Sequence, residues 1–298
     1  MKSKFLVLGG SGFIGSYIVN ELSKTSEVIA TYSSYSNDEK LIQFNIQTDD
    51  ISKIIDEYFK NIEKKTAVIT IANSKIDDCL RNEASAYDIN VVKMKEIILK
   101  LYKNDFKVIF LSTDNVYNGK DGQYTEDMAP NPINNYGKQK ALIEQFIQDE
   151  IPHGLVLRLS QTVGTKPNES HIFKDWINSI KDAKDIICIN GQKFTPTLVD
   201  DVALGVKLAI QKDLKGVYNL VANESFTREK LLNKFLKILD IKDKPSCYVK
   251  ELDFFNFLEK RALDTSLVND KIKKDLDIHF TSMDTILNQL KKEIGYIL

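Results

Sequence analysis

The chain has 298 residues, 43% of them hydrophobic and 28% charged, which is typical of a folded globular protein and too apolar for a disordered one. Lysine and arginine total 41 against 42 aspartate and glutamate residues, so the net charge of −1 offers no strong field to nucleic acid or to an anionic membrane. Three widely spaced cysteines give neither a disulfide framework nor a metal-binding pair and fit a reducing compartment. Since no stretch approaches the roughly 18 apolar residues of a membrane span, we expect a cytoplasmic protein.

Strand-like and helix-like patterns alternate along the first half of the chain. Residues 4–8 form a short apolar run that ends in two glycines, and Phe13–Ser23 carries apolar residues at helical spacing. Further strands are predicted at 27–32, 67–72, 107–112 and 154–159, and further helices at 51–59, 84–102 and 138–149. This alternation predicts right-handed βαβ units, and therefore an α/β fold with a Rossmann-type, doubly wound parallel sheet.

The pattern changes after about residue 162. Predicted helices at 172–180, 199–210 and 227–239 surround only two apolar strands, at 185–189 and 216–221. We predict a dinucleotide-binding Rossmann domain at 1–162, to which residues 195–223 return. A smaller C-terminal α+β lobe, formed by residues 163–194 and 224–298, is predicted to bind the substrate.

A glycine-rich segment follows the first predicted strand. Residues 9–15 read GGSGFIG and contain both the GxGxxG and the GxxGxxG spacing. Glycines allow the tight strand-to-helix turn, the close approach of a pyrophosphate and close helix–strand packing, and the phosphates then meet unpaired N–H groups at the helix N-terminus. Its place between a strand and a helix predicts a dinucleotide site rather than an ordinary glycine-rich turn.

The end of the second predicted strand bears on the choice between NAD and NADP. NAD sites usually have Asp or Glu there to bind the ribose 2′-hydroxyl. This chain has hydroxyl side chains at Thr31, Tyr32, Ser33 and Ser34 and no carboxylate before Asp38. We therefore expect NADP(H) to be preferred, with NAD(H) as the alternative, although no nearby arginine supports a 2′-phosphate.

Tyr136 and Lys140 form a YxxxK pair. Residues four apart lie on one face of a helix, so the ammonium can lie beside the phenol and stabilise the phenolate. Lowering the tyrosine pKa from about 10 to about 7 takes about 4 kcal/mol, which the ammonium and the positive charge of a nicotinamide ring could supply together. Thr113 ends the preceding strand at the sheet edge where α/β proteins bind ligands. The pattern therefore predicts a tyrosine of lowered pKa close to Thr113.

Several segments together resemble one family of enzymes. They are GGSGFIG at 9–15, LSTDNVYNG at 111–119, YTED at 124–127, NPINNYGKQK at 131–140, LRLS at 157–160, FTPTLVDDVA at 194–203 and RALDTSL at 261–267. In this order they resemble extended short-chain dehydrogenases/reductases that process nucleotide sugars, and most of all the dTDP-4-dehydrorhamnose reductases. The resemblance covers nearly the whole chain.

The resemblance implies NAD(P)H-dependent reduction of a nucleotide-activated 4-keto sugar for surface-polysaccharide synthesis. Tyr136 would donate a proton to the carbonyl, Lys140 would lower its pKa and bind the nicotinamide ribose, and Thr113 would hydrogen-bond the carbonyl oxygen. The implied cofactor site comprises Gly9, Ser11, Gly12, Phe13, Ile14, Gly15, Ser33, Ser34, Asn45, Ile46, Ile71, Ala72, Asn73, Tyr136 and Lys140. The implied substrate site comprises Asp114, Asn115, Gln161, Phe194 and Thr195. The family also makes a homodimer plausible.

Two departures from the family bear on the substrate. Asn115 stands where the rhamnose-pathway reductases usually have Tyr, and Gln161 where they usually have Trp. Polar side chains suit a more hydroxylated ring than a 6-deoxy sugar, so we expect a related but different nucleotide sugar. The dehydratase relatives have Asp-Glu at 114–115, and the loss of the second carboxylate makes dehydration unlikely to be the reaction here.

Other functions stay open. An NADP-binding regulatory subunit would keep the fold without turnover, although the intact Thr113, Tyr136 and Lys140 weigh against it. A nucleotide-sugar epimerase that retains its cofactor and a reductase of other carbonyls are further alternatives. No metal site is expected, because His153, His171 and His279 lack ligand spacing. Trp176 is expected in the core of the lobe.

Overall fold

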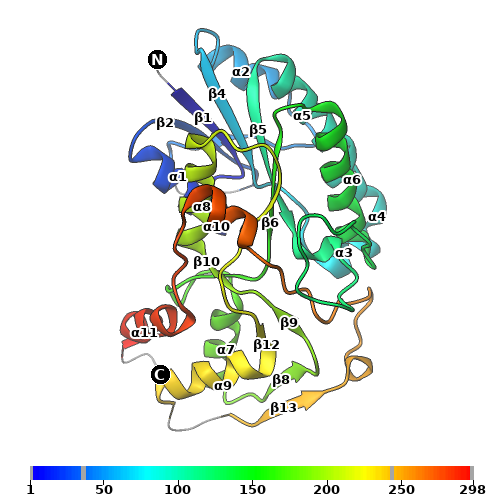
Figure 1. Cartoon of the computed structure of the whole chain (residues 1–298), viewed down its shortest axis with the longest axis vertical. Helices are drawn as coiled ribbons and strands as arrows, with labels where there is room; N and C mark the ends of the chain where they lie inside the picture. Colours follow the sequence, from blue (N-terminus) through cyan, green and yellow to red (C-terminus); the bar gives the residue numbers. More distant parts are fainter. Residues whose placement is uncertain (1–2, 35–37, 242–244, 296–298) are drawn as a thin grey trace.

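The computed structural model describes residues 3–34, 38–241 and 245–295 and is built around one large sheet (Figure 1). Its seven strands lie in the order β11-β6-β5-β4-β1-β2-β3, and every neighbouring pair is parallel. The strands are β1 (Ser3–Leu8), β2 (Glu27–Tyr32), β3 (Ile42–Gln43), β4 (Lys64–Ile69), β5 (Phe106–Thr113), β6 (Leu155–Leu159) and β11 (Gly216–Asn219). This confirms the predicted doubly wound parallel sheet.

The strand order reverses in the middle of the sheet. Strand β1 pairs with β2 on one side and with β4 on the other. The chain therefore runs outward from β1 in one direction through β2 and β3, and in the other direction from β4 through β5, β6 and β11. A crevice forms at such a switch point, at the carboxyl ends of the strands, and doubly wound proteins bind their ligands there.

Helices cover both faces of the sheet because its central strands are apolar on both sides. Phe5 and Val7 of β1 pack in one core, with helices α1 (Phe13–Ser23), α8 (Val199–Gln211) and α10 (Asp270–Leu276). Leu6 and Leu8 pack in the opposite core, with α2 (Ser52–Tyr58), α5 (Met94–Lys103) and α6 (Asn135–Glu150). Continuous apolar runs are typical of strands buried in this way. None of the helices in the described residues is both long and apolar enough to cross a membrane.

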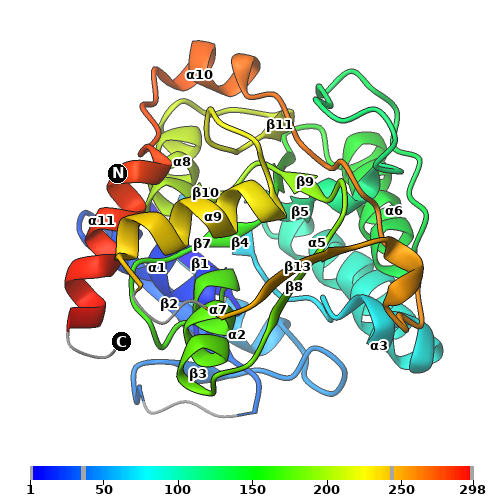
Figure 2. The same ribbon diagram turned by 90° about the horizontal axis from the view of Figure 1, so that it is seen from below.

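A smaller body, which we call the small lobe, lies at one end of the sheet (Figures 1 and 2). It consists of α7 (Ile172–Lys181), β8 (Ile186–Ile189), β9 (Lys193–Phe194), β12 (Phe226–Thr227), α9 (Arg228–Leu239), β13 (Cys247–Lys250) and α11 (Met283–Ile294). Its own apolar core contains Phe173, Trp176, Phe235 and Leu287. Trp176 is thus a core residue, as its helical spacing predicts.

The sequence underestimates the number of strands after residue 162. Besides β8 and β11, the structure contains β7 (Thr162–Val163), β9, β10 (Thr197–Leu198), β12 and β13. Four of these five strands have only two residues, which is too short to show a period in the sequence. The division into two domains stays a prediction. Helix α10 was expected in the lobe, but it packs against strand β11 of the sheet and against helix α8.

The predicted helix at 84–102 is also wrong in detail. It is divided into α4 (Glu83–Tyr87), a π-helical segment (Asp88–Lys93) and α5, and it follows the short helix α3 (Ile76–Arg81). Segments of π-helix occur mostly as single bulges and frequently lie at functional sites. This one places Asn90 beside the end of β4, as described below.

Candidate active site

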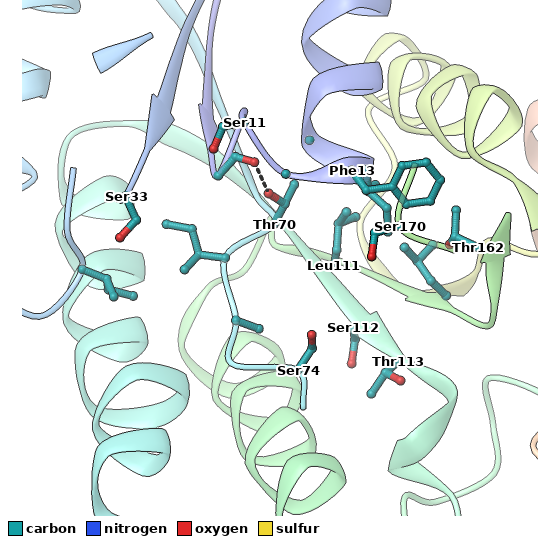
Figure 3. Close-up of a pocket in the computed structure, with 18 of the residues that line it drawn as sticks. Ser11, Phe13, Ser33, Thr70, Ser74, Leu111, Ser112, Thr113, Thr162 and Ser170 are labelled. Atoms are coloured by element: carbon teal, nitrogen blue, oxygen red, sulfur yellow. Dashed lines mark hydrogen bonds between the residues drawn. The ribbon is translucent and has the colours of Figure 1, made fainter. Parts of the chain in front are cut away.

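A cleft of about 580 Å³ lies at the switch point of the sheet (Figure 3). It is lined by the glycine-rich turn, by the segments that follow β2 and β4, and by the end of β5. Figure 3 shows Ser11 and Phe13 at the glycine-rich turn, Ser33 after β2, and Ser112 and Thr113 at the end of β5. Of the described residues that line this cleft, Lys140 alone carries a charge.

The glycine-rich turn leaves the N-terminus of α1 open to a ligand. Gly9 has a φ of +90°, and a Cβ atom on Gly15 would lie 2.1 Å from the Gly9 carbonyl oxygen, so both positions require glycine. Gly12 caps the helix without a side chain, and the first turn contains no acidic residue. The backbone N–H groups and the positive end of the helix dipole are therefore available to a pyrophosphate.

The cleft continues along β2 toward an apolar floor. The Thr31 hydroxyl accepts a hydrogen bond of 3.0 Å from the Gly9 N–H, which fixes the turn on β2. Ser33, Ile46, Ile71 and Ala72 line the cleft, as the family resemblance implies. Ser34, Asn45 and Asn73 are absent from the lining, so the structure does not bring these three predicted cofactor residues to the cleft.

Asn90 holds the backbone of Asn73 in the segment that follows β4. The Asn90 Oδ1 accepts from the Asn73 N–H at 2.8 Å, and its Nδ2 donates to the Asn73 carbonyl at 2.9 Å. The same Nδ2 donates to Gln139 Oε1 on α6 at 2.7 Å. The π-helical segment therefore joins the segment after β4 to the helix that carries Tyr136 and Lys140.

The start of α6 brings Tyr136 to the end of β5. The Asn134 side chain caps the helix and accepts from the Gly137 N–H at 2.8 Å. A Cβ atom on Gly137 would lie 2.1 Å from the Asn115 carbonyl oxygen, so the helix packs directly on the turn after Thr113. Thr113, Tyr136 and Lys140 consequently line the same cleft.

Lys140 is a buried cation at the base of this cleft. The residue is 4% exposed, its Nζ donates to the Leu111 carbonyl oxygen at 2.8 Å, and the Nζ lies 4.2 Å from the centre of the Phe110 ring. Burial lowers the pKa of Lys140 to about 7. The Lys140 side chain therefore changes between the ammonium and the neutral amine near neutral pH.

Burial and the negative charge of Asp114 raise the pKa of Tyr136, and the Thr113 hydroxyl lowers it by a smaller amount. The Lys140 ammonium is directed to the Leu111 carbonyl. The predicted lowering of the Tyr136 pKa also requires the positive charge of a bound nicotinamide, so it stays a prediction.

A second cavity of about 420 Å³ adjoins the cleft. Both are lined by Thr113 and Tyr136. The predicted substrate residues Asp114, Asn115, Gln161 and Phe194 line it, and Gln192, Arg261, Ala262 and Thr265 add side chains from the small lobe and from the segment after β13. Thr195 is different: it is 1% exposed, absent from the lining, and bonded through its hydroxyl to the Leu267 N–H at 3.0 Å.

Comparison with known proteins identifies the family. A family model described as the RmlD substrate binding domain matches residues 3–295. The chain belongs to this family. It is 26% identical to the probable low-salt glycan biosynthesis reductase Agl14 of Haloferax volcanii, over 78% of this chain and 79% of that protein. It is 28% identical to the dTDP-4-dehydrorhamnose reductase of Salmonella typhimurium, over 59% of this chain and 60% of that protein.

A solved structure shows the same fold. The dTDP-4-dehydrorhamnose reductase of Bacillus anthracis, in complex with NADP, superimposes with a TM-score of 0.84 at 22% identity, over 98% of this chain and 100% of that one. The resemblance drawn from the seven sequence segments is therefore confirmed at the level of family and fold.

Sequence reasoning missed several polar residues of this RmlD-family site. Ser74, Thr162 and Ser170 line both cavities. Ser112 also lines the cleft, and among the described residues its Oγ is a buried atom without a hydrogen-bond partner. Ser112 has a signal in the sequence, since it precedes Thr113 at a strand end. Ser74 and Ser170 lie in loops and Thr162 begins β7, and none of the three belongs to a motif.

His171 and Asp77 have partners within the chain. The His171 ring packs against Phe13 and its Nε2 lies 3.0 Å from the Lys166 carbonyl oxygen. Asp77 pairs with Arg261 at 2.8 Å. Among the described residues, no group of three or more His, Cys, Asp or Glu side chains could hold a metal ion.

Proposed function

We propose that this protein is a cytoplasmic, NADP(H)-preferring reductase of the keto group of a nucleotide-activated sugar, a 4-keto sugar by family resemblance, in glycan-precursor synthesis. One observation carries the proposal: a cleft suited to a dinucleotide and a polar cavity suited to a sugar meet at Thr113 and Tyr136. The family membership and the reductase names of the two relatives support the same reaction class.

The residues of the cleft fit a dinucleotide. The open N-terminus of α1 suits the pyrophosphate, and the unpartnered Ser112 Oγ offers a hydrogen bond near the end of β5. No carboxylate stands beside Ser33 to repel a 2′-phosphate in the described lining, and the Bacillus anthracis relative is described in complex with NADP. These observations support NADP(H), with NAD(H) as the alternative. When bound, the cofactor supplies a hydride.

The chain supplies the proton and the orientation. Thr113 binds the carbonyl oxygen of the sugar and holds it toward Tyr136. The Tyr136 phenol donates its proton to that oxygen as the carbonyl carbon receives the hydride, so the ketone becomes an alcohol. This is general-acid catalysis by a positioned side chain.

The polar lining of the second cavity supports a hydroxylated sugar ring. Gln161 and Gln192 place carboxamides there, and Arg261 adds a cation suited to a diphosphate. We therefore expect slower turnover with dTDP-4-dehydrorhamnose than with a nucleotide 4-keto sugar that keeps its C6 hydroxyl. Side-by-side initial rates test this, and faster reduction of dTDP-4-dehydrorhamnose would contradict it.

The reaction itself is tested by NADPH oxidation with a panel of nucleotide keto sugars. Tyr136→Phe should lower kcat by roughly 10²-fold or more, as expected for loss of a general acid, and should leave NADPH binding intact. Tyr102→Phe, at an exposed position on α5, serves as the control. Unchanged turnover in Tyr136→Phe would contradict the mechanism.

The alternatives predict different behaviour. An epimerase should retain tightly bound NAD on purification, whereas a reductase should exchange NADPH rapidly. A regulatory subunit should bind NADPH but show no turnover with any sugar of the panel. Sedimentation of the purified chain tests the predicted homodimer.

A further inference from the structure

Asp114 is a buried carboxylate that receives four hydrogen bonds. It is 6% exposed and stands directly after β5. Thr113 Oγ1 donates to its Oδ1 at 3.2 Å and Asn115 Nδ2 donates to the same atom at 2.9 Å. Ser160 Oγ and Thr265 Oγ1 donate to its Oδ2 at 2.7 and 2.8 Å. Four donors match the acceptor sites of an ionised carboxylate.

These donors come from distant parts of the chain. Thr113 and Asn115 flank Asp114, Ser160 follows β6, and Thr265 lies in the segment between β13 and α10. Ser160 Oγ also accepts from the Thr195 N–H at 3.1 Å. Asp114 therefore connects the ends of two sheet strands to Thr195, which follows Phe194 of the second cavity.

The network leaves Thr113 free to change its partner. Thr113 has a single hydroxyl proton, which it gives to Asp114 in this structure. When that proton turns toward a substrate carbonyl, Asn115 Nδ2 still donates to the same carboxylate oxygen. The Asn115 carboxamide thus serves Asp114, which differs from the direct sugar contact that the family resemblance implies.

We propose that Asp114 is a positioning residue that fastens Thr195, the neighbour of Phe194 in the second cavity, to the end of β5 through Ser160 and Thr265. Asp114 transfers no proton itself. The inference rests on the proposed function, since it takes the second cavity as the substrate site.

The test is Asp114→Asn, followed by amide hydrogen exchange at Thr195. Asparagine keeps the shape of the side chain but replaces one acceptor oxygen by an N–H donor, so the donors around it lose part of their acceptor. Exchange at the Thr195 amide should accelerate by about tenfold or more. In a chain that turns over substrate, KM for the sugar should rise more than kcat falls. Unchanged exchange at Thr195 would overturn the proposal.

Asp201→Asn is the matched control. Asp201 is 7% exposed and accepts hydrogen bonds from the Thr281 N–H at 2.7 Å and the Thr281 hydroxyl at 3.0 Å. Its neutralisation removes a similar buried carboxylate that takes no part in the Asp114 network. Exchange at Thr195 should stay unchanged in this variant. An equal acceleration in both variants would show a general effect and overturn the proposal.

Thr265→Val remains informative where Asp114→Asn does not fold, because it removes one donor and keeps the carboxylate. Amide hydrogen exchange at Thr195 and Leu267 should accelerate by about tenfold or more, and KM for the sugar should rise more than kcat falls. Unchanged exchange at both amides would overturn the proposal. Hydrogen exchange needs neither cofactor nor sugar, so it stands apart from the test of the proposed reaction.

Discussion

Lys140 of α6 and Arg158 of β6 are both buried cations, and their surroundings differ. Arg158 of β6 is 2% exposed; its Nε and Nη2 donate to Glu144 of α6, which is 0% exposed, and its Nη1 donates to the Tyr117 hydroxyl. Lys140, four residues before Glu144 on the same helix, donates instead to a backbone carbonyl. The pKa of Arg158 is accordingly raised by Glu144, whereas burial lowers the pKa of Lys140 to about 7.

The contrast separates a structural charge from a functional one. The Arg158–Glu144 pair joins β6 to α6 and leaves neither charge exposed to a ligand. Lys140 lines the cleft and has its charge only partly compensated. A buried charge without a matching partner costs stability, so we interpret Lys140 as a residue retained for chemistry at the expense of the fold.

The largest expected effect on stability comes from breaking the structural pair. Glu144→Gln leaves the Arg158 guanidinium buried without its carboxylate, which should reduce the free energy of unfolding by about 3–5 kcal/mol. Urea denaturation measures the change. Glu150→Gln, at an exposed position near the end of the same helix, is the control and should shift the free energy by less than about 0.5 kcal/mol. An equal loss of unfolding free energy in the two variants would show that the buried pair stabilises the fold no more than an exposed carboxylate does.

The functional cation should behave in the opposite way. The pKa of Lys140 is lower in the folded chain than its usual 10.5, so the unfolded chain binds more protons between about pH 7 and 10.5, and stability rises with pH there. Lys140→Met removes this dependence. The variant should therefore be more stable than the parent at pH 6, and the advantage should shrink by about 4 kcal/mol by pH 10.

Denaturation of both proteins at pH 6, 8 and 10 measures this difference. Turnover should be lost in Lys140→Met at every pH at which the parent is active. A variant less stable than the parent at pH 6 would show that the ammonium is compensated in the folded chain, and the contrast with Arg158 would disappear.

The smallest expected effect concerns an uncharged group. The Ser112 Oγ is buried without a hydrogen-bond partner, so Ser112→Ala should leave the free energy of unfolding within about 0.5 kcal/mol of the parent. If this hydroxyl binds the cofactor, the Kd for NADPH should rise about fivefold, which corresponds to roughly 1 kcal/mol. Calorimetric titration with NADPH measures it, and an unchanged Kd would remove Ser112 from the site.

The cofactor half of the molecule could be predicted from the sequence because its signals are local. The turn at Gly9–Gly15 lies between a continuous apolar strand and a helix with a 3.6-residue period, and each of these is visible within a few residues. The same holds for Tyr136 and Lys140, whose spacing places them on one face of α6. The structure brings these residues to the cleft.

The substrate half could not be predicted to the same depth, because long-range contacts form it. Thr265 reaches Asp114 across 151 positions in the chain, and Arg261 reaches Asp77 from the segment after β13. No local hydrophobic period or sequence motif predicts these two contacts. Helical spacing likewise predicted the position of Lys140 but not its hydrogen bond to the Leu111 carbonyl.

The central claim is that a hydride donor in the cleft and a keto sugar in the adjoining cavity meet at Thr113 and Tyr136. The most direct test uses NADPH with deuterium at both C4 positions of the nicotinamide and the nucleotide keto sugar that is turned over fastest. Mass and NMR spectra of the product should show one deuterium on the former carbonyl carbon, with negligible transfer in Tyr136→Phe. Product without deuterium, or labelled product at an equal rate from Tyr136→Phe, would contradict the account.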